Sequence, residues 1–391
     1  MISSWLYSEI SISIAAGLIT SAVVAVIAVV WRHGIVQALW ERLSLTIFWY
    51  SASPESSSHS YRKMLANFVR WLRADQSRKG PHYGQFGLHA AIEEEARYQT
   101  GHEELAAKPR MFLTLWPVEI LRRRGLLDYS IAIAVRGVER LLINGRVRVF
   151  QSAENRMSPT RSASVISFRH TLAAALILIS SGRWSRVVHN IVGAMLDEGG
   201  GWQNQDGGWA QCDRQYTESD IYASSYALRI LFESLKRRDF DIEGQKVMET
   251  SLDRTLSYFE EVWSVDKWKY GDVSSEENAP YVLSLIAPVL LERRPLLARS
   301  VIAHMRSWMT QANTPSQLYL HQCANDSLLA LCSRLAYAMY RAGAEKVMWH
   351  SLFEYGLEHL GETANSAEIS FMLDLLYVAR GEENIAIKRS N

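Results

Sequence analysis

Cysteine is scarce in this sequence: Cys212, Cys323 and Cys332 are the only three among 391 residues. So few cysteines do not make a disulfide framework, which favours a reducing compartment. A surplus of one charge is lacking too, because 42 lysines and arginines face 41 aspartates and glutamates. This balance argues against nucleic acid as a partner. The one local cluster of positive charge, at residues 122–124 before Gly125, is typical of a helix C-terminus.

Strand-like alternation of apolar and polar residues is also hard to find. The closest case, Val149 and Phe150 beside a turn, is too short to predict a sheet. A phosphate-binding loop, an aspartate-rich magnesium motif and a nucleophile-elbow pattern are missing as well. Hydrophobic residues still make up 48% of the chain, enough for a sizeable core. The sequence therefore predicts an all-α protein.

A long apolar run lies near the N-terminus. Residues 10–31 carry no charged side chain, and a run of about 20 apolar residues is long enough to cross a bilayer as a helix. A cleaved signal peptide fits poorly because no positive residues precede the run; a buried core helix is the other alternative. Glu9 precedes the run, and Arg32, His33 and Arg42 follow it. By the positive-inside tendency we expect a single span in the inner or plasma membrane with the bulk of the chain in the cytoplasm.

Two shorter segments separate this span from the rest. Residues 35–50 are apolar but interrupted by charges, which favours an amphipathic helix at the membrane surface. Residues 51–60 are serine-rich and typical of a linker. We therefore expect an anchor and juxtamembrane helix at 1–50, a linker at 51–60 and one helical domain at 61–391.

The helical domain shows a recurring unit, in which a polar or glycine-rich turn precedes an apolar helix. Successive unit starts are about 40 to 60 residues apart, room for two helices and their connections. The starts are at Pro109, Ser167, Ser219, Glu277, Cys323 and Asn365. Six such units predict an (α/α)6 toroid of helical hairpins, preceded by one transmembrane helix. An open solenoid of helix pairs would show the same spacing.

The most distinctive stretch runs from Gly199 to Leu231. It opens with the turn GGGWQNQDGGW, and weaker echoes occur as YGQFG at residues 83–87 and WKYG at residues 268–271. This turn resembles the Gln-Trp motif of triterpene cyclases such as squalene–hopene cyclase, with Gln203, Gly207 and Trp209 at its positions. The resemblance implies the toroid shared by these cyclases and protein prenyltransferase β subunits. It also implies that the glutamine binds neighbouring helix ends and that the tryptophan stacks nearby.

An acidic pair, Glu218 and Asp220, precedes the apolar helix. Class II terpene cyclases carry an Asp-x-Asp-Asp motif after such a turn, and its middle aspartic acid protonates the substrate. The resemblance places Glu218 at the first acidic position and Asp220 at the middle one, whereas Ile221 replaces the last aspartate. A carboxylate here is also typical of a helix N-cap, and similar residues begin other units: Ser167, Asn278, Asn325 or Asp326, and Asn365 or Ser366. We favour capping, with proton donation and ligand contact as the alternatives.

The helix starts also predict where a ligand would bind. In a toroid of this type the inner helices run in one direction, so their N-termini converge at one mouth. Free amides and helix dipoles there favour an anion, and Arg169 and His170 would add charge. A prenyl diphosphate or a lipid headgroup would suit this mouth. Further candidates for ligand contact are Trp209, Tyr222, Asn278 and Asp326.

We predict no metal and no cofactor. Protein prenyltransferases bind zinc through Asp, Cys and His, which here would require Cys212 and Asp213 to meet His321 and Cys323. The order of these residues differs from the Asp-x-Cys of that family, and the two pairs are over 100 residues apart.

The sequence thus predicts a membrane-anchored, cytoplasmic α-toroid that acts by binding. Its partner would be an isoprenoid or other lipid-like ligand, or a protein, and a bacterial signalling or defence assembly would fit. Two enzymatic alternatives stay open. One is an isoprenoid cyclase or prenyltransferase with Asp220 and Glu218 as acids. The other is a glycan-processing (α/α)6 enzyme that pairs either of these carboxylates with Glu276 or Asp326 across a cleft.

Overall fold

The computed structural model describes residues 57–78, 83–87, 111–142, 145–150, 164–197, 202–212, 218–237, 239–268, 278–311, 328–358 and 365–379. These ranges contain twelve helices and one two-stranded sheet, so the prediction of a mainly helical protein is confirmed. No helix within them is both long and apolar enough to cross a bilayer. The predicted span and juxtamembrane helix lie outside these ranges, as does the linker up to residue 56. Helix α3 begins at Ser57, so the last four residues of the predicted linker are helical.

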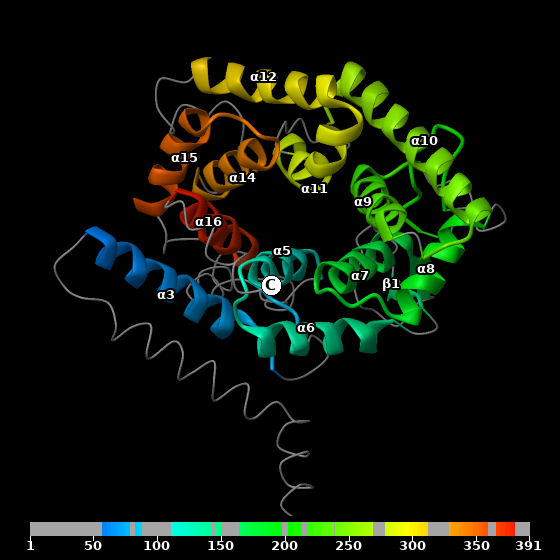
Figure 1. Cartoon of the computed structure of the whole chain (residues 1–391), viewed down its shortest axis with the longest axis horizontal. Coiled ribbons are helices and arrows are strands. Elements are labelled where there is room, and N and C mark those ends of the chain that lie inside the picture. Colours follow the sequence, from blue (N-terminus) through cyan, green and yellow to red (C-terminus); the bar gives the residue numbers. More distant parts are fainter. Residues whose placement is uncertain are drawn as a thin grey trace, which may run out of the picture.

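Six helices form an inner layer around a common centre (Figure 1). Each contacts the next along the chain, and α16 contacts α5, so the contacts close a cycle. These inner helices are α5 (Met111–Arg123), α7 (Phe168–Ser180), α9 (Ile221–Arg237), α11 (Asn278–Arg293), α14 (Leu328–Arg341) and α16 (Ser366–Ala379). They begin one to five residues after the six predicted unit starts, because polar capping residues before an apolar run mark a helix start locally.

Six further helices surround the inner layer (Figure 1). Five of them follow an inner helix in the chain and pack on it, whereas α3 packs on α16, the last inner helix. These outer helices are α3 (Ser57–Asp75), α6 (Asp128–Leu141), α8 (Arg186–Leu196), α10 (Ile242–Asp266), α12 (Pro295–Gln311) and α15 (Lys346–Glu358). The first outer helix thus pairs with the last inner one.

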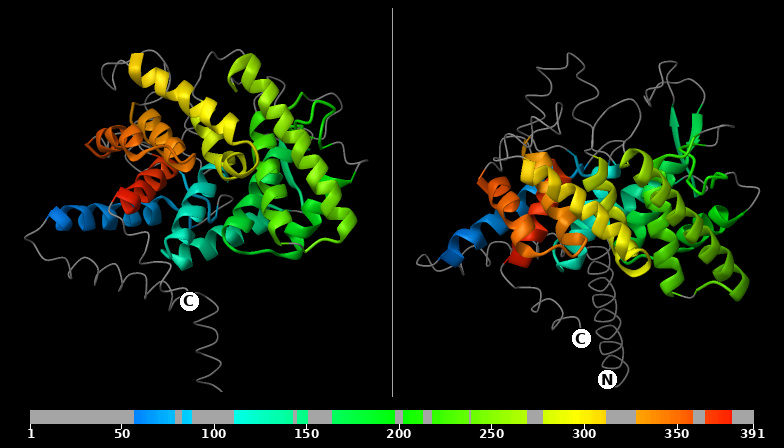
Figure 2. Two further views of the ribbon diagram at one scale, coloured as in Figure 1. Left: turned by 45° about the horizontal axis from the view of Figure 1, so that its top comes forward. Right: turned by 90° about the horizontal axis from the view of Figure 1, so that it is seen from above.

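A small hairpin departs from the helical pattern. Strands β1 (Val147–Phe150) and β2 (Ser164–Ser167) pair antiparallel, with Val147 opposite Ser167. The alternation at Val149 and Phe150 was too short to predict a sheet. The sheet forms because two strands that are separated by 13 residues of chain pair with each other. Since Ser167 is also the N-cap of α7, the hairpin lies where an inner helix begins; Figure 2 shows it standing off one face of the helices.

Aromatic side chains fill the centre of the inner layer. The indole of Trp116 on α5 makes edge contacts with Tyr281 on α11, Tyr337 on α14 and Phe371 on α16, at ring-centre distances of 5.9, 5.7 and 5.0 Å. Helices α5 and α11 are not neighbours in the cycle, so these rings meet across its middle. At this level the centre of the inner layer is packed core.

Candidate functional site

The turn with the Gln-Trp resemblance lies between α8 and α9 in the chain and packs against α10. The side chain of Gln203 donates to the backbone oxygens of Gly207 and Ser251, and its own oxygen accepts from the Ser251 hydroxyl. Both Gln203 and the indole N–H of Trp209 donate to Thr255 Oγ1, at 3.1 and 2.9 Å. Ser251 and Thr255 lie within α10, so the glutamine binds the side of an outer helix rather than a helix end. Trp209 is fully buried in this arrangement, which assigns its surface to packing.

Gly207 is required for the close approach of this turn to α10. Its backbone φ is +89°, and a Cβ at this position would lie 2.4 Å from the carbonyl oxygen of Arg254. A side chain is excluded on both counts. The turn therefore presses directly on the helix backbone.

A second copy of this arrangement occurs before α5. Gln76 donates to the carbonyl oxygens of Gly84 and of Ser130 on α6, and pairs with Phe86 as Gln203 pairs with Trp209. Gly84 has a φ of +83°, and its Cβ would meet the carbonyl oxygen of Ile133 at 2.3 Å. The sequence pointed to residues 83–87 as an echo but missed Gln76, because eight residues separate it from the glycine instead of four.

The two turns also contact the inner helices in the same way. The amide of Phe86 donates to Thr114 and that of Trp209 donates to Ser224, each the fourth residue of its helix. Val147 of the β-hairpin donates to Thr171, the fourth residue of α7. A hydroxyl in the first turn thus fixes each preceding segment to its inner helix. The other echo begins at Trp268, two residues after the end of α10, and its residues 269–271 lie outside the described part of the chain.

The two glutamines offer a matched test of this repeat. Replacing Gln76 or Gln203 by leucine removes the donor to a buried helix carbonyl, and we expect each change to lower the free energy of unfolding by about 2 kcal/mol. Gln205→Leu, on the exposed side of the second turn, is the control and should change it by less than about 0.5 kcal/mol. Urea unfolding measures all three. A neutral Gln76→Leu would show that the first turn does not brace α6.

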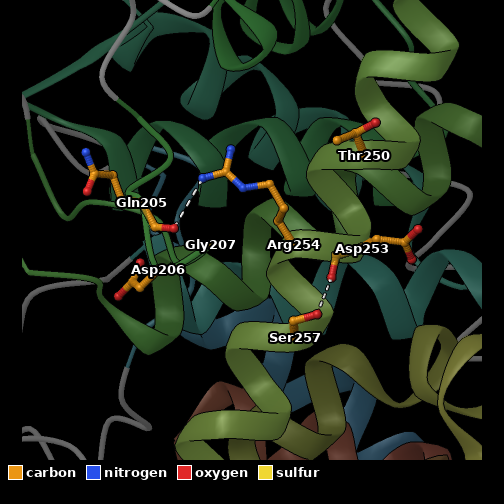
Figure 3. Close-up of a pocket in the computed structure, with 7 residues that line it drawn as sticks. All are labelled: Gln205, Asp206, Gly207, Thr250, Asp253, Arg254 and Ser257. Carbon is orange, nitrogen blue, oxygen red and sulfur yellow. Dashed lines mark hydrogen bonds between the residues drawn. The ribbon is translucent and has the colours of Figure 1, made fainter.

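The motif-bearing turn also borders a surface pocket of about 460 Å³ between the turn and α10 (Figure 3). Its lining is polar and consists of Gln205, Asp206, Gly207, Thr250, Asp253, Arg254 and Ser257. Arg254 donates to the carbonyl oxygen of Asn204, and Asp206 accepts from Gly208 and Ser219. Arg254 and Asp206 of the pocket lining thus stabilise the conformation of the turn.

Asp220 occupies the N-cap of α9. Its Oδ1 accepts from the amide of Ala223 at 2.6 Å, and its backbone amide donates to the carbonyl of Trp209. Its Oδ2 is buried and lies 3.7 Å from Nη1 of Arg169. Glu218 is exposed. The favoured interpretation of Asp220 as a cap agrees with this geometry.

Arg169 is the centre of a cluster that joins three inner helices. Its guanidinium carbon lies 4.7 Å from the ring centre of Phe112 on α5 and 4.5 Å from that of Tyr222 on α9. These residues stand in the first turns of their helices, so the N-termini of α5, α7 and α9 converge, as predicted. The Arg169 side chain keeps 19% of its surface exposed. We call Phe112, Arg169, His170, Asp220 and Tyr222 the mouth cluster.

His170 completes the mouth cluster. Its Nδ1 lies 2.7 Å from the hydroxyl of Ser167, which caps α7, and its ring packs against Phe112 at 4.7 Å. Burial, and then the charge of Arg169, lower the pKa of His170 to about 4. At neutral pH the imidazole is therefore uncharged, and Arg169 alone supplies positive charge to the cluster.

A second arginine, Arg334 on α14, lies at the start of α16. Arg334 bonds Glu368 at 3.1 Å, and Glu368 also accepts from the amide of Asn365, which caps α16 in turn. Burial raises the pKa of Tyr222 and Tyr281, and the charges of Arg169 and Arg334 both oppose that rise. The side chain of Arg334 is 24% exposed. Sequence reasoning missed this pair.

The remaining candidates are placed only in part. Asn278 begins α11, while Glu276 and Asp326 lie outside the described residues, as do the zinc candidates Asp213, His321 and Cys323. Cys212 is buried and pairs with Ser167 through the backbone. Within the described ranges no group of His, Cys, Asp and Glu side chains could hold a metal ion.

Comparisons with protein-family models, curated proteins and solved structures find no match to this chain.

Proposed function

We propose that the chain forms an (α/α)6 toroid of the terpene cyclase and prenyltransferase type that binds an anionic, lipid-like ligand at the mouth cluster. The closed cycle of inner helix contacts supports the toroid, as do the two Gln-Gly-aromatic turns. Arg169 carries the binding proposal, because a partly exposed guanidinium between two aromatic rings offers charge and apolar surface together.

The contacts of Asp220 favour binding over cyclisation. Protonating an alkene requires a neutral carboxylic acid with a proton to give. Asp220 instead accepts an amide hydrogen on Oδ1 and faces a guanidinium with Oδ2, and both contacts suit a carboxylate. The isoprenoid cyclase remains the alternative.

The ligand class follows from two partly exposed arginines at the starts of inner helices, Arg169 beside Asp220 and Arg334 beside Glu368. Arg169 and Arg334 are 19% and 24% exposed, so part of each guanidinium can meet an anionic oxygen. The rings of Phe112 and Tyr222 offer an apolar surface to the attached chain. The helical domain is proposed to lie on the cytoplasmic side of the membrane, where an anchor at residues 10–31 would keep this mouth near lipids.

Farnesyl diphosphate is a suitable probe for the full-length protein in mild detergent. Calorimetric titration should show binding that Arg169→Gln weakens about tenfold or more, since a charge-assisted hydrogen bond is lost. Arg183→Gln removes an equal charge from an exposed side chain beyond α7 and is the control. Neutral farnesol should bind more weakly than the diphosphate. Equal loss in the two arginine variants would contradict the mouth as the site.

Asp220→Asn separates binding from catalysis in the same preparation. Asparagine can cap α9, and removal of the charge beside Arg169 should keep or strengthen binding of the diphosphate. A wild-type protein that converts an isoprenoid substrate to product, with conversion lost in Asp220→Asn, would favour the cyclase instead.

A further inference from the structure

A second cluster of charged side chains lies inside the inner layer, away from the mouth cluster. Glu119 on α5 is shared by Arg229 on α9 and Arg341 on α14, at 3.0 and 2.9 Å. Asp374 on α16 is shared by Arg123 and Arg124, from the end of α5. We call these six residues the arginine cluster. Arg123 also donates to the hydroxyl of Tyr337 on α14 at 3.0 Å. This bond links the group around Asp374 to α14, the helix that carries Arg341 of the group around Glu119.

The arginine cluster carries a net positive charge. Four arginines face two carboxylates, a surplus of two positive charges, and three of these arginines are less than a tenth exposed. The helices α5 and α14 end here, and each helix dipole contributes about half a negative charge. About one positive charge then lacks a counterpart among the described residues, and uncompensated buried charge is costly.

Arg123 is accessible from outside. One third of its side-chain surface is exposed, in contrast to Asp374, which is fully buried. Arg123 stands in the last turn of α5, so this access lies on the side where α5 ends, opposite to the mouth cluster at its first turn. An anion could reach its guanidinium there without passing the aromatic centre.

We propose that the arginine cluster binds a phosphate or diphosphate group through Arg123 at the C-terminal ends of the inner helices. The planar guanidinium offers paired donors that match phosphate oxygens, and a bound dianion would balance the surplus charge. The phosphate can belong to a free small molecule or to a lipid headgroup. This site is separate from the mouth cluster and does not depend on it.

Titration of the full chain in mild detergent with inorganic pyrophosphate tests the site. We expect Arg123→Gln to weaken binding about tenfold or more. The variant should stay folded because Arg124 still holds Asp374. Arg122→Gln is the matched control: it removes the same charge one residue away, where the side chain lies over Gly182 outside the cluster, and it should leave affinity within about twofold. Because the mouth cluster is itself proposed to bind a diphosphate, Arg123→Gln is also compared with its parent in the Arg169→Gln background, where the weakening by Arg123→Gln should persist.

Two further measurements complete the test. Asp374→Asn removes a counter-charge, so pyrophosphate should bind several-fold more tightly and raise the melting temperature of this variant more than that of the wild type. A lipid source would appear as retention of phosphatidic acid over phosphatidylcholine in native mass spectrometry, abolished by Arg123→Gln. The proposal is overturned if neither probe binds, or if Arg122→Gln and Arg123→Gln weaken binding equally.

Discussion

Replacing Glu119 by glutamine is expected to lower the free energy of unfolding by about 3 to 5 kcal/mol, one of the two largest effects predicted here. Glutamine keeps the shape of the side chain but removes the charge that Arg229 and Arg341 share. Both guanidiniums would then lie buried beside a neutral group. Urea unfolding monitored by circular dichroism measures the difference.

The surface pair of Arg293 and Glu249 is a matched control, because its atoms lie 2.6 Å apart but its side chains are 33% and 40% exposed. Glu249→Gln should cost less than about 1 kcal/mol, since water screens an exposed pair. A similar cost for both variants would mean that the cluster is solvated.

The pH dependence gives an independent check on Glu119. Burial opposes its ionisation, but Arg229, Arg341 and Arg123 outweigh burial and hold its pKa well below the ordinary value of 4.5. The carboxylate therefore contributes stability in full at pH 7 and loses it as the pH falls below about 4.5. The gap between the wild type and Glu119→Gln should accordingly narrow in acid.

Replacing Gly137 by alanine is expected to cost about 3 kcal/mol, although alanine is the better helix former by about 1 kcal/mol. Gly137 lies within α6, and a Cβ there would stand 1.9 Å from the carbonyl oxygen of Tyr83. The backbone of the first braced turn would have to move away from the helix.

Gly193 in α8 provides the control, because no atom lies within 4 Å of its Cβ position. Gly193→Ala should therefore stabilise the protein by about 0.5 to 1 kcal/mol. Thermal unfolding of the two variants should show shifts of opposite sign. A stabilising Gly137→Ala would exclude the close packing of residues 83–87 on α6.

The sequence predicted the inner helices well because their starts are marked locally. Ser167, Asp220 and Asn365 are capping residues directly before apolar runs, and the structure confirms all three as caps. Residues 122–124 were also expected at a helix end, and α5 does end at Arg123. Such signals depend on a few neighbouring residues, so they can be found without knowledge of the fold.

The groups that unite distant helices could not be predicted in this way. Arg123 and Asp374 are 251 residues apart, and nothing in either local sequence names the other as a partner. Gln76 was missed for a related reason, since extra residues before Gly84 hide the spacing of the motif. The mouth cluster lies between these cases. Four of its members were predicted individually, namely Arg169, His170, Asp220 and Tyr222, whereas Phe112 emerged only from the packing.

The pairing of α3 with α16 has a consequence for biosynthesis. About 290 residues separate the end of α3 from the start of α16. At translation speeds of 5 to 20 residues per second, the nascent α3 would wait roughly 15 to 60 s on the ribosome for its partner. During this time the apolar face formed by Leu65, Phe68, Val69 and Leu72 would be open to chaperones or to premature association. A circular permutant that starts at α16 and continues through a short linker into α3 would synthesise the two helices together and remove this delay.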